Sequence, residues 1–152
     1  MLFMIQLIKT LYGDCKILEN DIKDIESNFS IRIPEKLKKF YLDYNGADIY
    51  LCQFTMDNPS VEPFEVHTIY PIKYCASPYG VTLEKVIEGD RLDGFLLSNL
   101  IPFAEDQGGD RYYYDNNTEE VFWISSDDID NPEKVCDSVA EFISKLSVCS
   151  NI

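Results

Sequence analysis

Positive charge is scarce in this sequence. The chain has 13 lysines and arginines and 27 acidic side chains, which gives a formal net charge of −14 over 152 residues. A surface of this sign repels the phosphate backbone, so the charge excludes nucleic acid as a partner. Residues 105–141 carry most of the excess, because Arg111 and Lys134 are the only bases there. Such a concentrated negative field attracts cationic partners and speeds their association, and a merely solubilising surface is the alternative interpretation.

Recognisable catalytic patterns are also lacking. His67 is the single histidine, and no cysteine or aspartate motif accompanies it in its strand-like run. There is no phosphate-binding Gly-x-x-x-x-Gly-Lys loop and no Gly-x-Ser-x-Gly elbow. The run 105–110 holds three carboxylates but lacks the ligand spacing of a calcium loop. Ordinary packing of His67 and a solvated hairpin tip are the simpler interpretations. We therefore expect no enzyme, no cofactor and no metal, although a Cys–His pair formed only by folding stays open.

Cysteines and long apolar runs do not point to secretion or to a membrane. The five cysteines are odd in number, widely spaced and without a Cys-x-x-Cys pair, which excludes a disulfide framework or zinc site of the usual kind. No apolar run approaches the roughly 18–20 residues that cross a bilayer. Residues 1–8 lack the basic start and cleavage site of a secretory signal. We expect a cytoplasmic protein with reduced thiols and no membrane partner.

The hydrophobic content of 45% is enough for one folded domain, which we expect to span residues 1–152. Apolar residues at helical spacing predict helices over 4–12, 20–29, 34–44, 79–88 and 138–146. We expect Asn20 to cap the second of these, Pro34 to open the third, and Ser138 with Glu141 to cap the last. Asn45-Gly46 is expected to end the third helix, because both residues tolerate a left-handed backbone.

Runs rich in β-branched and aromatic residues predict strands over 49–54, 64–70, 100–104, 111–114 and 121–124. Short turns at 107–110 and 115–117 separate the last three, which indicates an antiparallel meander. The order of helices, then strands, then a helix is typical of an α+β fold. We expect a largely antiparallel mixed β-sheet with helices packed on one face.

Aromatic residues gather in the predicted meander between the acidic ones. Strand alternation sends Tyr112 and Tyr114 to one face and Tyr113 to the other, so one set packs under the helices and the other faces water or a partner. Tyrosine is enriched at protein interfaces. The predicted partner-binding residues are Asp106, Asp110, Tyr112, Tyr114, Asp115, Glu119 and Glu120.

Several short motifs occur together in a fixed order. The first group is Ile25-Glu26, Ile33-Pro34-Glu35, Phe40 and Asn45-Gly46. The second group is Leu100-Ile101-Pro102-Phe103-Ala104, Asp106, Gly108-Gly109-Asp110, Tyr112, Val121, Asp137-Ser138-Val139 and Glu141-Phe142-Ile143. This ordered set resembles the SUKH superfamily, the Smi/Knr-type domains, and it extends from about Ile25 to Leu146.

The resemblance implies an α+β fold and the usual bacterial role of the superfamily. That role is an immunity protein which binds and neutralises a cognate polymorphic toxin, often a nuclease, so the expected partner is a basic toxin domain. The alternative is a regulatory scaffold that binds a housekeeping protein, as in eukaryotic members that regulate cell-wall assembly. Residues 47–97 depart from the pattern, so the resemblance does not identify the toxin.

Overall fold

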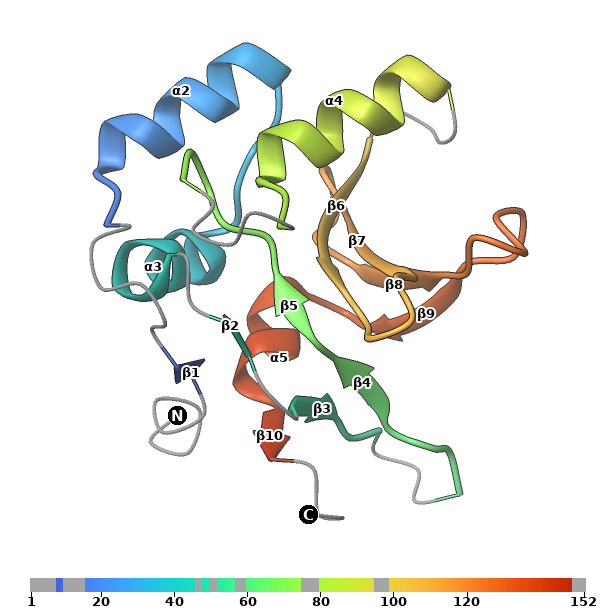
Figure 1. Cartoon of the computed structure of the whole chain (residues 1–152). Coiled ribbons are helices and arrows are strands. Elements are labelled where there is room, and N and C mark those ends of the chain that lie inside the picture. Colours follow the sequence, from blue (N-terminus) through green and yellow to red (C-terminus); the bar gives the residue numbers. More distant parts are fainter. Residues whose placement is uncertain are drawn as a thin grey trace.

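The main element of the fold is a five-stranded antiparallel sheet (Figure 1). The computed structural model describes residues 8–9, 16–45, 48–49, 52–56, 60–74, 80–94 and 99–148. The sheet order is β5 (Thr68–Ile69), β6 (Leu100–Glu105), β7 (Arg111–Asp115), β8 (Val121–Ile124) and β9 (Glu133–Cys136). Strands β6, β7 and β8 follow one another through short turns, which confirms the predicted meander.

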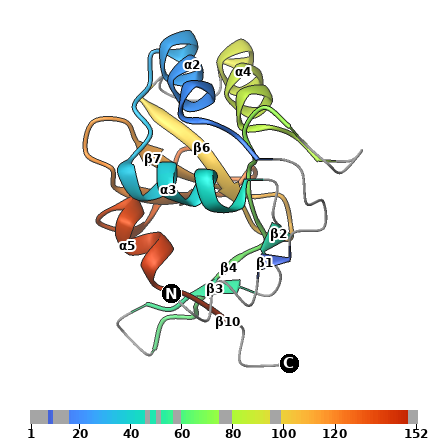
Figure 2. The same cartoon turned by 90° about the vertical axis from the view of Figure 1, so that its left-hand side faces the viewer.

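Two small sheets and four helices complete the described part of the chain. One sheet has the order β10 (Leu146–Val148), β3 (Cys52–Phe54), β4 (Phe64–Val66), and the other pairs β1 (Ile8–Lys9) with β2 (Asp48–Ile49). The helices are α2 (Glu19–Phe29), α3 (Glu35–Tyr44), α4 (Leu83–Asp93) and α5 (Val139–Ser144). Figure 2 shows α2 and α4 side by side at one end of the molecule, with α3 and α5 below them. The predicted α+β class is confirmed.

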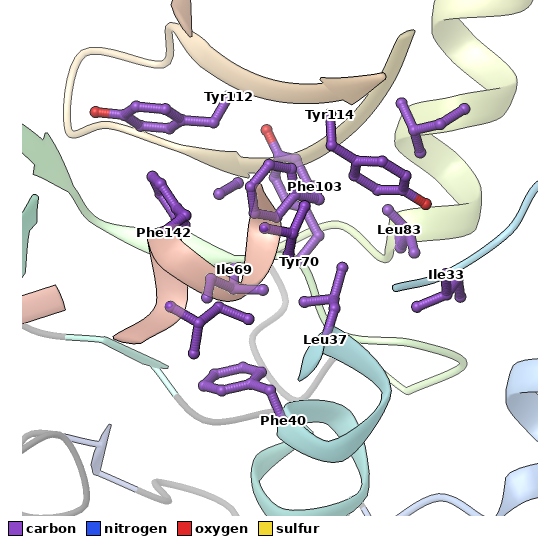
Figure 3. Close-up of a cluster of buried hydrophobic side chains, with 14 of the residues drawn as sticks. Ile33, Leu37, Phe40, Ile69, Tyr70, Leu83, Phe103, Tyr112, Tyr114 and Phe142 are labelled. Atoms are coloured by element: carbon purple, nitrogen blue, oxygen red, sulfur yellow. The ribbon is translucent and has the colours of Figure 1, made fainter. Parts of the chain in front are cut away.

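All four helices contribute to one hydrophobic core, which also contains the Tyr112 and Tyr114 side of the main sheet (Figure 3). Phe142 of α5 contacts three other rings of this core. The Phe142 ring stacks on Phe54 with 5.7 Å between centroids, and it meets the edges or faces of Phe103 and Tyr112 at 5.3 Å each. Aromatic rings at these distances gain from both area burial and favourable ring geometry.

The helix predictions were accurate where a single amphipathic face decides the structure. Helix α3 begins after Pro34 and buries Leu37, Phe40 and Tyr41, as its spacing predicted. Helix α5 begins after Ser138, whose hydroxyl accepts a hydrogen bond from the Glu141 amide at 3.1 Å. Local sequence signals thus set where both helices begin.

Other boundaries were predicted wrongly. The cap of helix α2 is Leu18, two residues before the predicted Asn20, since the Asp21 carboxylate accepts from the Leu18 amide and closes the first turn. Ile8–Lys9 form a strand, so the helix predicted over 4–12 is wrong there, and its other residues lie outside those described. Helix α4 begins and ends about one turn later than predicted, with Thr82 as its cap. Strand β9 was not predicted, and Leu146, which was expected in the last helix, belongs to strand β10, because α5 ends at Ser144.

Asn45 ends α3 in a different way from the one predicted. Its backbone has φ −57° and ψ 133°, which is not left-handed. Its side chain instead binds the buried backbone of Ile72 twice: the Ile72 amide donates to Oδ1 at 2.7 Å, and Nδ2 donates to the Ile72 carbonyl at 2.9 Å. Asn45 therefore acts through its side chain and not through a left-handed backbone.

We expect Asn45→Ala to lower the free energy of unfolding by about 1–3 kcal/mol, because it leaves a buried amide and carbonyl without partners. Urea denaturation measures this change. Asn45→Asp keeps the acceptor and loses the donor, so it is expected to fall between alanine and the native protein. An alanine variant as stable as the native protein would contradict the role given to this side chain.

Candidate functional site

Two of the predicted contact residues, Tyr112 and Tyr114, lie in the core. Their exposed fractions are 0% and 1%, so the prediction that they touch a partner is wrong. The Tyr112 hydroxyl donates to the Glu65 carbonyl and the Tyr114 hydroxyl to the Arg32 carbonyl. Burial raises the pKa of both phenols, so they remain protonated donors. Their role is to bind distant backbone segments to the sheet.

The five predicted carboxylates separate into two groups at opposite ends of β7. Asp106 and Asp110 lie in the turn that precedes the strand, whereas Asp115, Glu119 and Glu120 lie at its end and in the next turn. A strand of five residues separates its ends by roughly 13–17 Å. The expectation of one shared acidic surface therefore does not hold for the whole set.

The group at the end of β7 is partly paired within the chain. Lys134 Nζ lies 2.8 Å from Glu120, and Arg32 lies 3.9 Å from Glu119. The hydrogen bond from Lys134 lowers the pKa of Glu120. Asp115 accepts from the amides of Asn117 and Thr118 and so shapes the turn. These three acids have a structural role in this fold.

The group before β7 keeps its negative charge. Asp106 accepts from the Asp110 amide at 3.0 Å and from the Trp123 indole at 3.1 Å. Asp110 accepts from both the amide and the hydroxyl of Ser126, at 2.9 and 3.1 Å. Within the described part of the chain, no lysine or arginine pairs with Asp106 or Asp110. Neutral donors thus fix both carboxylates while leaving them charged.

A groove of about 220 Å³ opens beside this turn, and we call it the acidic groove. Its sides are the last turn of α4 and the loop between β8 and β9, which Figure 1 shows facing each other. Its lining residues are Asp90, Asp93, Gly109, Asp110, Arg111, Tyr113, Ile124, Ser125, Ser126 and Ile129. The loop adds three more exposed acids, Asp127, Asp128 and Asp130. The acidic groove therefore combines a negative rim with an apolar and aromatic floor.

Asp90 holds α4 against the sheet at the groove floor. Its two oxygens bind different residues of β7: Arg111 Nη1 lies 2.6 Å from Oδ1, and the Tyr113 hydroxyl donates to Oδ2 at 3.1 Å. Burial, and then the Asp90 charge, raise the pKa of Tyr113 to about 12. A carboxylate near a helix C-terminus is unfavourable by itself, so Asp90 depends on these partners. The contact fixes the α4 side of the groove, and it pairs the Arg111 guanidinium with a carboxylate of the same chain.

Sequence reasoning missed Asp90 and Asp93 as members of this site. The predicted helix ended at residue 88, and no local signal relates α4 to a turn some twenty residues later. The Tyr113 side chain was expected to face water or a partner if the other face packed inside, yet it is only 3% exposed. The sequence did indicate Asp127, Asp128 and Asp130 as candidate site residues, because they lie in the acidic segment 105–141.

His67 and Cys136 are the alternative candidates that the structure describes. His67 is exposed between β4 and β5, and its backbone amide donates to the Glu105 carbonyl at 2.9 Å. Burial raises the pKa of the Cys136 thiol to about 12, so this cysteine stays protonated. Among the residues that the structure describes, no group of three His, Cys, Asp or Glu is placed to hold a metal ion. No helix among them has the length and apolar character needed to cross a membrane.

Comparison with known proteins agrees with the fold and the ordered motifs. No curated protein matches the chain. A family model does match, over residues 16–145, and this range includes every helix of the described structure and all strands of the main sheet. The chain belongs to the SMI1 / KNR4 family (SUKH-1).

Proposed function

We propose that the chain is an immunity protein that binds and neutralises a cognate toxin through the acidic groove. The family to which it belongs includes toxin immunity proteins. The observation that carries the proposal is the set of carboxylates in the groove lining and on the β8–β9 loop that have no cationic partner among the described residues, namely Asp93, Asp110, Asp127, Asp128 and Asp130. Charges left unpaired in a folded domain are free to meet charges of a partner.

The partner is a basic toxin domain, with a nuclease as the favoured class. Nucleases bind phosphates in basic clefts, so an acidic surface placed in such a cleft competes directly with the substrate. Arg111 does not counter this attraction, because Asp90 already pairs with it at 2.6 Å. Inhibition of this kind is by binding alone, in the cytoplasm, and requires no catalytic residue, cofactor or metal from the inhibitor.

The groove is suited to binding because its surroundings are already ordered. Ser126 attaches the β8–β9 loop to Asp110, and Asp90 attaches α4 to β7. A partner that docks on a surface held in this way loses less free energy to ordering of loops. The half-buried Ile129 adds apolar contact area in the groove lining.

Co-expression tests the proposal. We expect cells that produce the toxin domain encoded beside this gene to survive when they also produce this chain, and the two proteins to co-purify at low salt. Toxin activity that is unchanged by an excess of folded chain would contradict an immunity role. A gene without a toxin neighbour, together with stable binding to a housekeeping protein, would favour the regulatory scaffold instead.

A further inference from the structure

Residues Pro71–Lys73 connect three helices, and we call this segment with its partners the Lys73 junction. Asn45 binds the segment to α3, as described above. Lys73 Nζ lies 2.9 Å from Asp21 of α2, and the Lys73 amide donates to Glu84 Oε2 of α4 at 2.9 Å. Lys73 has a φ of +66°, in the left-handed region, and only surrounding contacts maintain this conformation in a non-glycine residue. The junction therefore depends on two carboxylates on opposite sides of Lys73.

Among the described residues, two buried side-chain atoms have no hydrogen-bond partner, one on α3 and one on α4. They are the Tyr41 hydroxyl oxygen and Glu84 Oε1, the second oxygen of the carboxylate that holds the Lys73 amide. Each buried polar group left unpaired costs stability, and the cost is larger for a charged one. An ionised Glu84 is thus poorly accommodated, whereas a neutral carboxyl loses little by burial of the same oxygen.

The geometry points to a proton-sensitive joint: Glu84 takes up a proton in mild acid, and α2, α3 and α4 are held more firmly around Lys73 in that state. The Lys73 amide donates to Glu84 Oε2, so it keeps its acceptor whether Glu84 is ionised or protonated at Oε1. Protonation removes the buried charge at Oε1 and gives the carboxyl an O–H group of its own. The inference is independent of the acidic groove and of any partner.

The charges that face Glu84 from each packed element agree with this direction. Burial raises the pKa of Glu84, and the Asp21 charge on α2 raises it further, while bonds to backbone amides oppose both. On α3, burial raises the pKa of Tyr41 well above its usual value. The Tyr41 phenol therefore stays protonated and carries no charge at mildly acidic or neutral pH. Lys73 has a raised pKa through its bond to Asp21 and stays cationic.

The two carboxylates of the junction titrate in opposite directions. For Glu84, with a folded-state pKa above its unfolded value, the stabilising contribution is present at low pH and is lost as pH rises through the folded-state pKa. For Asp21, the Leu18 amide and Lys73 lower the pKa, so its contribution is lost only as pH falls through that lowered value. The junction is therefore firmest in the mildly acidic window between them.

Glu84→Gln, which imitates the protonated side chain, tests the inference. We expect the urea midpoint of E84Q to exceed that of the native protein at about pH 7.5, and the two midpoints to converge by about pH 4 as Glu84 becomes protonated in both folded and unfolded chains. Glu88→Gln is the matched control, because Glu88 is exposed on the same helix and the change in charge is the same. E88Q is expected to follow the native profile.

Two results would overturn the inference. One is an E84Q midpoint that equals or falls below the native midpoint at about pH 7.5, at which an ordinary glutamate is ionised. The other is a carboxyl-carbon NMR titration of Glu84 in the native protein with a midpoint at or below the ordinary glutamate value. The second measurement does not require any variant to fold.

Discussion

Phe142→Ala is expected to lower the free energy of unfolding by about 3–5 kcal/mol. Phe142 is fully buried and contacts Phe54, Phe103 and Tyr112, so its loss leaves a cavity between α5 and two of the sheets. Helix α5 has only six residues and is too short to be stable without this packing. The total free energy of unfolding of such a domain is about 5–15 kcal/mol, so the variant is expected to lose a large part of its stability.

Urea denaturation followed by the fluorescence of Trp123, the single tryptophan, measures this loss. Phe122→Ala is the matched control, because Phe122 is a half-buried phenylalanine of β8 outside the core. It is expected to cost less than half as much. If both variants lose the same stability, the ring cluster around Phe142 is not the centre of the core.

Reversing three acids of the groove region to lysine is expected to slow association with the cognate toxin domain by about 10–100-fold. The variant is Asp93→Lys, Asp127→Lys and Asp130→Lys. These side chains are exposed and form no hydrogen bond or ion pair with the described residues, so the fold is expected to remain intact. Stopped-flow or surface-based kinetics at several salt concentrations measure the rate, and the dependence on salt is expected to weaken.

The control for this variant makes the same change in net charge elsewhere. Asp24→Lys, Asp43→Lys and Glu62→Lys replace three exposed acids on α2, on α3 and in the segment before β4. Association of this control is expected to slow much less. Equal slowing of both variants would show that the overall charge, and not the acidic groove, attracts the partner.

Local patterns predicted those parts of the fold that a single element determines. The spacing of Leu37, Phe40 and Tyr41 identified α3, and Ser138 with Glu141 identified the start of α5. Strand β9 was missed because its burial does not alternate: Glu133 and Lys134 are exposed, and the next two residues are buried. Short edge strands of this kind carry little periodic signal.

The candidate site was predictable only in part, because it depends on packing between distant elements. Alternation placed Tyr112 and Tyr113 on opposite faces correctly, but it contains no information on whether both faces are covered. The acidic segment 105–141 was visible in the sequence, whereas its division into a paired and an unpaired group depends on where Arg32 and Lys134 lie. No feature of the sequence placed Asp93 beside Asp110.

The acids that make the groove negative divide into those that support the fold and those that do not. Asp90 and Asp110 hold α4 and the β8–β9 loop in place, whereas the Asp93 and Asp130 side chains bind nothing among the described residues. Substitution of such exposed residues usually changes stability by no more than about 0.5 kcal/mol. If the proposed function holds, rim residues can therefore be exchanged one at a time to fit a new toxin while the domain stays folded.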